Sequence, residues 1–100
     1  MKFITAENIK QFEKAPLYSQ EKNENPKILV KFFCPWNQWT WYVTEASREE
    51  DDWLFFGYVI GHEKELGYFT LSELESVRGP GGLKIERDMY FEGHLKDVIE

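Results

Sequence analysis

Three runs of β-branched and aromatic residues lie close together near the middle of the chain, and they constrain its fold more than any other feature. They are KILVKFF at 27–33, WTWYVTE at 39–45 and WLFFGYVI at 53–60. Runs of this length and composition are typical of β-strands. Since short segments join them, we expect three consecutive antiparallel strands. The third run is apolar on both faces, which predicts a central strand, and Gly57 within it indicates a bulge or the close approach of another side chain.

Capping patterns predict one helix before these strands and another after them. Thr5 occupies an N-cap position ahead of a helix over residues 6–14. Thr70 forms a capping box with Glu73 and starts a helix over residues 71–77, which the following glycine-proline segment ends.

These elements predict one domain over residues 1–100, with an N-terminal helix and loop in residues 1–26 and a core in residues 27–91. A short strand is expected at 66–69, and a fifth strand or extended segment at 83–91. We therefore predict an α+β fold, in which a small curved antiparallel sheet of four to five strands forms a meander and carries one or two short helices.

The composition narrows the class of protein further. Of the 100 residues, 42% are hydrophobic and 17% are aromatic, which is enough for one core. The lone cysteine excludes an internal disulfide and suits a reducing compartment. No apolar run approaches the roughly 20 residues of a membrane span, so we expect a cytoplasmic protein without membrane contact. The net charge of −6 argues against a duplex-binding module, whose affinity comes largely from neutralised phosphates.

Four segments carry a resemblance to a known family. They are TWYVTE (40–45), FFGYVIG (55–61), ELGYFTLSELESVRGP (65–80) and IERDMYF (85–91). Through them, residues 27–91 resemble DUF2958, a family of small bacterial proteins of unassigned function that are associated with plasmids and conjugative or transposable elements. The resemblance implies a bacterial cytoplasmic accessory protein linked to mobile DNA, and it implies no catalytic residues.

The charged triplet Glu86-Arg87-Asp88 follows the glycine loop and allows two interpretations. The two carboxylates would point to one side of a strand and could hold a divalent cation if further oxygen ligands converged, as in a metal-dependent hydrolase. Alternatively, Arg87 is partly buried and pairs with a carboxylate such as Glu73 or Glu75, which would fix the loop. We favour this structural interpretation, which predicts that loss of Arg87 destabilises the fold. It concerns four residues, Arg78, Glu86, Arg87 and Asp88.

Three tryptophans and a tyrosine fall within seven residues and form the strongest candidate for a contact surface: Trp36, Trp39, Trp41 and Tyr42. Trp36 lies in a polar turn and is expected to be the most exposed. Exposed aromatic side chains can stack on single-stranded bases or anchor a protein interface. The same residues could instead form the core of a small sheet, because aromatics dominate small cores.

The histidines and the cysteine form no catalytic or metal-binding pattern. His62 and His94 lie in separate polar segments without a nucleophile at a suitable spacing, so we expect both to be solvated. One cysteine and two separated histidines do not make a zinc site. Cys34 is expected to be a small buried hydrophobe. We predict no cofactor and no metal.

The segment EASREEDD (45–52) carries five acidic residues and one arginine. We expect residues 46–52 to form a solvated loop between strands. The sharper alternative is an acidic patch at Glu49 to Asp52 that imitates nucleic acid and inhibits a basic enzyme, as an anti-restriction protein does.

The leading functional prediction is non-enzymatic. We expect an accessory domain of a bacterial mobile-element or plasmid pathway that contacts a partner through its aromatic sheet surface. A protein partner is expected first, with single-stranded nucleic acid as the alternative. The acidic inhibitor and the metal-dependent hydrolase, which would use Glu86 and Asp88, stay open as further alternatives. Exposed edge strands allow a monomer or a weak homodimer.

Overall fold

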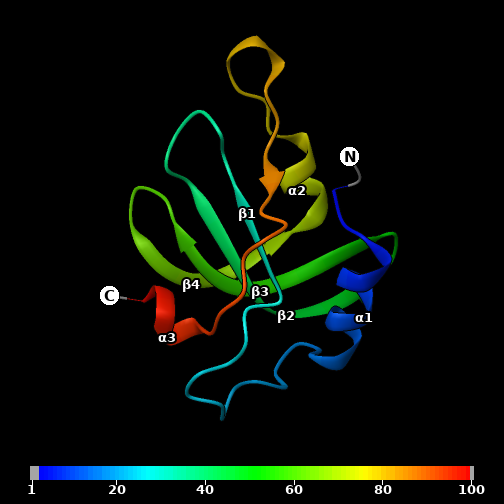
Figure 1. The fold of residues 1–100 in the computed structure, drawn as a ribbon. Helices are drawn as coiled ribbons and strands as arrows, with labels where there is room; N and C mark the ends of the chain where they lie inside the picture. The colour runs from blue at the N-terminus through cyan, green and yellow to red at the C-terminus, as the bar shows by residue number, and fades with distance from the viewer. Residues whose placement is uncertain (1–2, 100) are drawn as a thin grey trace.

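Five strands form one antiparallel sheet in the order β4–β3–β2–β1–β5, as the computed structural model shows (Figure 1). The structure describes residues 3–99. The strands are β1 Val30–Phe33, β2 Thr40–Glu49, β3 Asp52–Ile60, β4 Lys64–Thr70 and β5 Glu86–Arg87. The helices are α1 Ala6–Lys14, α2 Leu71–Ser76, a short 3-10 turn η1 Pro80–Gly82, and α3 Leu95–Val98. The predicted α+β fold with an antiparallel meander is confirmed, and β5 adds to it beside β1.

Two strands are shorter than their sequence patterns predict. β1 begins at Val30, inside the predicted run 27–33. β5 covers two residues of the predicted segment 83–91, because the chain turns at Asp88, whose carboxylate accepts a hydrogen bond from the Tyr90 amide (3.0 Å). The glycine-rich turn η1 ahead of β5 projects from one end of the molecule (Figure 1).

Both predicted N-caps are present, because each threonine satisfies backbone groups at the start of its helix. The Thr5 hydroxyl accepts from the Asn8 amide (3.1 Å), and the Asn8 side chain accepts from the Thr5 amide (2.9 Å). The Thr70 hydroxyl accepts from the Glu73 amide (3.2 Å), but the hydroxyl and not the Thr70 amide donates to the Glu73 carboxylate (3.0 Å), so the predicted capping box forms only in part. Among residues 3–99, no helix has the length and apolar character to cross a membrane.

The acidic segment 46–52 is not a loop, which corrects the prediction drawn from its charge. β2 continues to Glu49, and a two-residue turn at Glu50 and Asp51 leads into β3. The side chains of a strand point alternately to its two faces, so charged residues can face solvent while their neighbours face the core. The strand pattern of this part of β2 is hard to recognise in the sequence, because its one apolar residue, Ala46, is small and charged residues surround it.

A β-bulge in β2 changes which residues face each side of the sheet. The pairing with β3 shifts between Val43 and Glu45, which leaves Thr44 as the extra residue. Val43 and Ala46 therefore both pack in one core, while Thr44 and Glu45 line the other side. A Cβ at Gly57, the partner of Val43, would lie 1.8 Å from a main-chain oxygen of β2. The prediction from the glycine is therefore corrected in part: the bulge lies in the neighbouring strand β2, and the group that approaches Gly57 is main chain and not a side chain.

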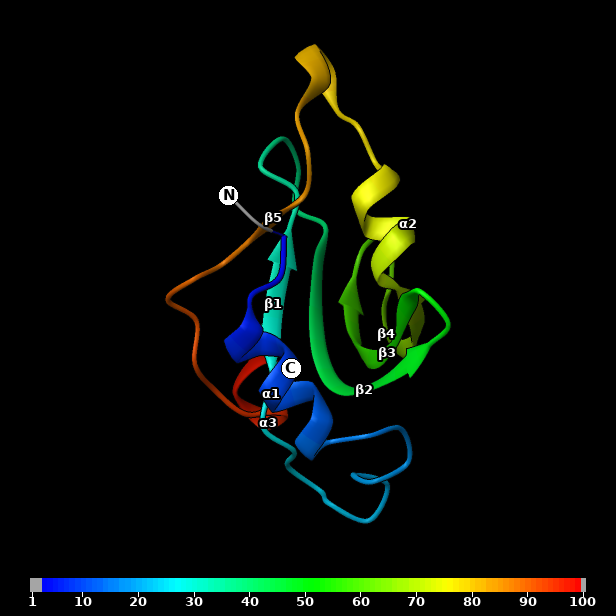
Figure 2. The ribbon, with the colours of Figure 1, turned by 90° about the vertical axis from the view of Figure 1, so that its right-hand side faces the viewer.

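One face of the sheet, here named the closed face, is covered by α1 and α2, which lie in front of the sheet in Figure 2. Phe12 of α1 packs against Phe32 and Phe55 of the strands, and all three are fully buried. The Phe12 ring centroid lies 5.2 Å from that of Phe55 and 5.1 Å from that of Trp53. Leu74 of α2 completes this core, which is the larger of the two hydrophobic clusters.

The opposite face, here named the open face, is covered over part of its area. Tyr42 and Tyr58 are buried there beneath Ile28 and beneath Leu95 of α3. The parts of β3 and β4 that lie beyond α3 keep large side chains partly exposed. The loop after α1 runs along the edge of β2 where β1 has ended, and the Ala46 amide donates to a carbonyl at the end of α1 (2.9 Å).

Candidate functional site

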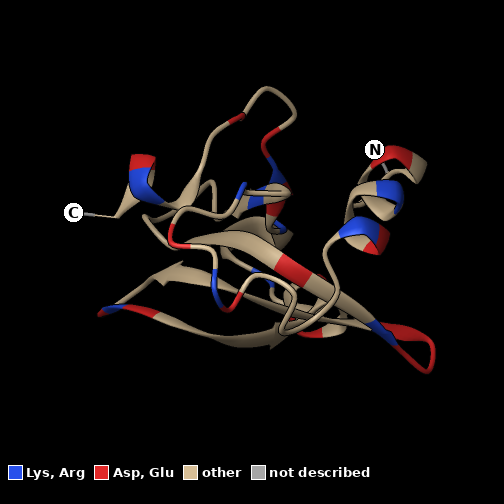
Figure 3. Cartoon of the chain, turned by 90° about the horizontal axis from the view of Figure 1, so that it is seen from below, with Lys and Arg blue, Asp and Glu red and all other residues tan. Residues whose placement is uncertain are grey.

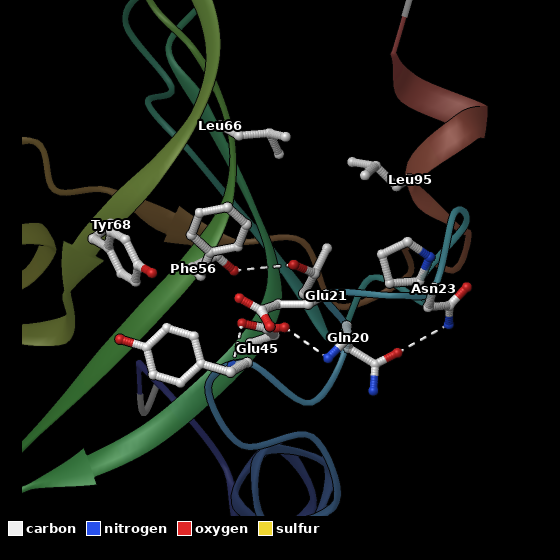
Figure 4. A pocket seen from close by; sticks show the side chains of 11 residues that line it. Gln20, Glu21, Asn23, Glu45, Phe56, Leu66, Tyr68 and Leu95 are labelled. Carbon is white, nitrogen blue, oxygen red and sulfur yellow. Dashed lines mark hydrogen bonds between the residues drawn. The ribbon is translucent and has the colours of Figure 1, made fainter.

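A groove of about 280 Å³ lies on the open face, between the sheet, the loop after α1 and α3 (Figure 4). Strands β2, β3 and β4 supply its floor and one wall. The side chains that shape it most are Tyr18, Thr44, Glu45, Phe56, Leu66 and Tyr68. None of these six belongs to the candidate site residues that the sequence patterns predict.

The walls of the groove are apolar and largely uncovered. Tyr18, Leu66 and Tyr68 expose 61%, 49% and 54% of their surface. The rings of Phe56 and Tyr68, on neighbouring strands, lie 4.9 Å apart at an angle of 58°. Large apolar side chains that stay exposed side by side are typical of interaction sites.

The floor of the groove holds a buried carboxylate. Glu45 is 4% exposed, and its two oxygens accept hydrogen bonds from the amides of Tyr18 (2.9 Å) and Gln20 (2.8 Å). The Thr44 hydroxyl beside it donates to the Phe56 carbonyl (3.2 Å), and Figure 4 shows these bonds as dashed lines. Glu45 therefore fastens the loop after α1 to the sheet.

The loop that borders the groove contains a strained residue. Tyr18 has a φ of 72°, in the left-handed region that residues other than glycine seldom adopt. The bond from its amide to Glu45 holds this conformation, and the Leu17 amide donates to the Ser47 hydroxyl (2.9 Å). Backbone outliers of this kind cluster at binding sites.

The side chain of Tyr68 lies across the groove from Tyr18. Partial desolvation and a hydrogen bond with Tyr18, together with nearby charges, raise the pKa of Tyr68.

The predicted aromatic contact surface is largely packed inside the protein. Trp41 and Tyr42 are each 8% exposed, and they point into the two different cores. Trp36, expected to be the most exposed, is half-buried like Trp39. The Trp36 ring packs against Gly79, and the Trp39 ring packs against Gly61. A Cβ at either glycine would lie 2.4 Å from the nearest ring atom. The four side chains do not form one exposed surface, and their positions fit the alternative that they contribute to packing.

The charged triplet links β5 to distant parts of the chain. Arg87 is 9% exposed, and its Nη1 donates to the main-chain carbonyl of Phe3 (2.9 Å). The Asp88 carboxylate lies 3.6 Å from Lys31 Nζ on β1, and Glu86 is exposed. These contacts suit a structural role. Destabilisation on removal of Arg87 stays a prediction.

Arg78 forms hydrogen bonds at the C-terminal end of α2. Its Nη1 donates to the carbonyl of Glu75 (2.6 Å), in the last turn of the helix, and to that of Val77 (2.9 Å), the C-cap residue. Within residues 3–99, no group of three His, Cys, Asp or Glu side chains is arranged to hold a metal ion.

The cysteine and the histidines lie in three separate places. Cys34 is buried, as predicted, and burial raises the pKa of its thiol. His62 is exposed and stands edge-on against Trp39, with ring centroids 5.4 Å apart. His94 is exposed at the start of α3, where its amide donates to the Asp97 carboxylate (2.8 Å).

Acidic residues gather at the tip of the β2–β3 hairpin, at the right-hand end of the chain in Figure 3. Glu49, Glu50 and Asp51 are exposed there. Asp52 instead binds the start of α2. Its carboxylate accepts hydrogen bonds from the Ser72 amide (3.1 Å) and from the Ser72 hydroxyl (2.6 Å). Desolvation opposes ionisation of Asp52, but these hydrogen bonds outweigh it and lower the pKa of the carboxyl.

Sequence reasoning missed the groove because its signal is weak along the chain. Phe56 sits in a run that is apolar on both faces, which indicates a strand covered on both sides. Leu66 and Tyr68 alternate on the short β4, and only the pairing of β4 with β3 brings them beside Phe56. A signal was available in the high share of aromatic residues, 17% of the chain.

One of the three comparisons with known proteins finds a match. No curated protein and no solved structure matches the chain. The sequence profile of the family described as "Protein of unknown function (DUF2958)" matches residues 3–97. The match extends beyond residues 27–91 and includes α1 and the loop that borders the groove. Since nearly the whole chain is matched, it belongs to the DUF2958 family.

Proposed function

We propose that this chain is a non-enzymatic binding domain that contacts a protein partner through the groove on its open face. The observation that carries the proposal is the exposure of Tyr18, Leu66 and Tyr68 around one hollow. Scattered exposed apolar residues are normal, but several that adjoin each other on a rigid sheet are typical of interfaces. Aromatic anchors of this kind supply much of the binding energy at protein interfaces.

The charge of the groove favours a protein partner over nucleic acid. Glu21 and Glu45 line it, and the whole chain carries a net charge of −6. A site for single-stranded nucleic acid combines aromatic side chains with cations that neutralise phosphates. The groove has the aromatic side chains but an acidic lining.

The cellular setting is part of the proposal and rests on the family resemblance. We expect the partner to act in a bacterial mobile-element or plasmid pathway. A metal-dependent hydrolase finds less support, because Asp88 pairs with Lys31 and no group of three His, Cys, Asp or Glu side chains within residues 3–99 is arranged to hold a metal ion.

The proposal is tested by capture of a partner from a nuclease-treated bacterial lysate on the tagged protein. Leu66→Ser combined with Tyr68→Ser removes two walls of the groove. Tyr90→Ser is the matched control, because Tyr90 is 88% exposed and lies outside the groove. We expect the wild type and the control to retain a protein that the double variant loses. A partner held equally by all three forms would contradict the proposal, and recovery only without nuclease would favour nucleic acid.

The hairpin tip supports a second candidate, the acidic inhibitor that imitates nucleic acid. Its support is the group of three exposed acidic residues Glu49, Glu50 and Asp51. The same capture with Glu49→Gln, Glu50→Gln and Asp51→Asn combined separates the two functions. Loss of a basic enzyme from this variant, with retention by the groove variant, would favour the inhibitor.

A further inference from the structure

Among the residues that the structure describes, the buried carboxylate of the groove has no cationic partner. Within residues 3–99, no Lys, Arg or His side chain pairs with Glu45, whose side chain is 4% exposed. Burial of a carboxylate is costly unless its charge is compensated. The amides of Tyr18 and Gln20 compensate it in part, but each carboxylate oxygen can accept a further hydrogen bond. Because Glu45 lines the groove, a cation placed in the groove would lie beside it.

A second carboxylate strengthens the negative charge at the same place. Glu21 lines the same groove as Glu45, from the loop after α1 (Figure 4). The pKa of Tyr68 is raised by partial desolvation, by Tyr18 and by the charges of Glu45 and Glu21. The field of the two carboxylates therefore reaches the opposite wall.

The aromatic walls suit a cation as well. The faces of aromatic rings attract ammonium and guanidinium groups at distances up to about 6 Å. Phe56 and Tyr68 meet at an angle of 58°, so they form two walls that are not parallel, and Tyr18 approaches from the loop. The protein uses this contact elsewhere on the open face, where Lys31 Nζ lies 5.7 Å from the Tyr42 ring centroid.

We propose that the groove binds the side chain of an arginine or lysine in a basic segment of the partner protein. This inference rests on the proposed function and names the chemical group that the groove recognises. The rings of Phe56 and Tyr68 contact the apolar stem and the cationic head, and Glu45 and Glu21 accept hydrogen bonds from the head. A volume of about 280 Å³ suits one long side chain rather than a larger ligand. Arginine is expected to bind more tightly than lysine, because its flat guanidinium stacks on rings.

The test titrates the intact ¹⁵N-labelled protein with two short peptides and follows its amide signals by NMR. The first is acetyl-Gly-Arg-Gly-amide, and the second carries citrulline, which matches arginine in length and shape but has no charge. We expect the arginine peptide to shift the signals of Tyr18, Phe56 and Tyr68 and to saturate them, with a Kd of about 1–10 mM. The citrulline peptide should bind at least about tenfold more weakly, and added salt should weaken the arginine peptide.

Variants of groove residues then identify the contacts. Tyr68→Ser removes an exposed ring and should lower the affinity by about threefold to tenfold, whereas Tyr68→Phe keeps the ring and should change it by less than about twofold. Glu21→Gln should lower the affinity by about twofold to threefold. Tyr90→Ser, outside the groove, should leave it unchanged. The spectrum of each variant shows directly that it is folded.

The outcomes separate this inference from the proposed function. Saturable shifts with arginine that are lost with citrulline and weakened by Tyr68→Ser support the cation site. Equal binding of both peptides, or no saturable shift of groove signals, overturns it. If the groove variant loses a captured partner while the arginine peptide fails to bind, the binding surface stands and the cation site falls. If the peptide binds but no partner depends on the groove, the proposed function falls and the cation site stands.

Discussion

The two faces of the sheet are built from the same kinds of side chain and differ in what covers them. On the closed face, Phe32 and Phe55 are fully buried in one cluster with Phe12 of α1 and Leu74 of α2. On the open face, Phe56 and Tyr68 form the wall of a groove. The contrast is sharpest within β3, where Phe55 and Phe56 are neighbours in the chain and point to opposite faces.

Stability and recognition are thus divided between the two faces of the sheet. The closed face is held by burial, whose contribution grows with the apolar area removed from water. The open face buries the smaller cluster around Tyr42 and Tyr58. Beside the groove, however, it is held by directed hydrogen bonds, because Glu45 fastens the Tyr18–Gln20 loop without covering the nearby rings. Apolar side chains can therefore stay available for a ligand while the loop beside them keeps its shape.

Adjacent residues of β4 give the largest expected contrast. Phe69 is 5% exposed and its ring lies 5.6 Å from that of Phe55, so Phe69→Ala should lower the free energy of unfolding by about 3–5 kcal/mol. Tyr68→Ala on the other face should cause only the small change that is usual for exposed side chains. Urea denaturation measures both. Similar losses from the two variants would show that the open face also carries stability.

Two glycines that pair across β3 and β4 form the next contrast. A Cβ at Gly57 would lie 1.8 Å from the Tyr42 carbonyl oxygen, so Gly57→Ala should cost about 3 kcal/mol by forcing β2 and β3 apart. Its partner Gly67 has no atom within 4 Å of such a Cβ, and Gly67→Ala should leave the stability unchanged or slightly raised. Thermal unfolding compares the pair. A harmless Gly57→Ala would show that the bulge in β2 is not held in place by this contact.

The loop at the groove tests the open face itself. Glu45→Ala leaves the amides of Tyr18 and Gln20 without their acceptor and should cost about 2 kcal/mol. Hydrogen exchange at these two amides should become much faster, while the amide of Phe55 on β3 keeps its protection until the whole domain unfolds. Glu65→Ala, on an exposed residue of β4, is the control. Unchanged exchange at Tyr18 would mean that the loop is held by other contacts.

The fold could be predicted from the sequence wherever the signal is local. The strand run 53–60 contains its own pattern, and the N-cap at Thr70 needs residues no further away than Glu73. The extension of β2 could not be seen, because the charges around Ala46 resemble those of a loop. The bulge at Thr44 could not be located either, since it is defined by the register with β3.

The candidate site was harder to predict because its parts are far apart in the chain. Glu45 lies in a charged run, and its role depends on amides 27 and 25 residues earlier. The tryptophans are the largest side chains of the sequence. Residue type, however, sets how much area a side chain can bury and not which face of the sheet is covered. Trp36 and Trp39 find cover against glycines, which no local pattern around them indicates.

Acid gives the smallest expected effect, and it separates the polar contacts of the two faces. Asp52 accepts hydrogen bonds from Ser72 at the start of α2, on the closed face, and its pKa in the folded protein is lowered. A carboxyl whose pKa is lower in the folded than in the unfolded state contributes stability above the unfolded pKa of about 3.9. That contribution is lost as the pH falls through the folded pKa. Since Asp52 is partly exposed, we expect it to be under about 1 kcal/mol.

Asp52→Asn should therefore be less stable than the wild type at pH 7 and should approach it as the pH falls below about 4, because protonation removes the same charge from the wild type. Urea midpoints of the two proteins over this range measure the difference. Hydrogen exchange of the Ser72 amide should become faster in the variant, while exchange at Tyr18 on the open face should not change. A gap between the two proteins that does not vary with pH would mean that Asp52 acts through its shape. Faster exchange at Tyr18 would mean that the polar contacts of the two faces are coupled, and the division of stability and recognition between them would have to be abandoned.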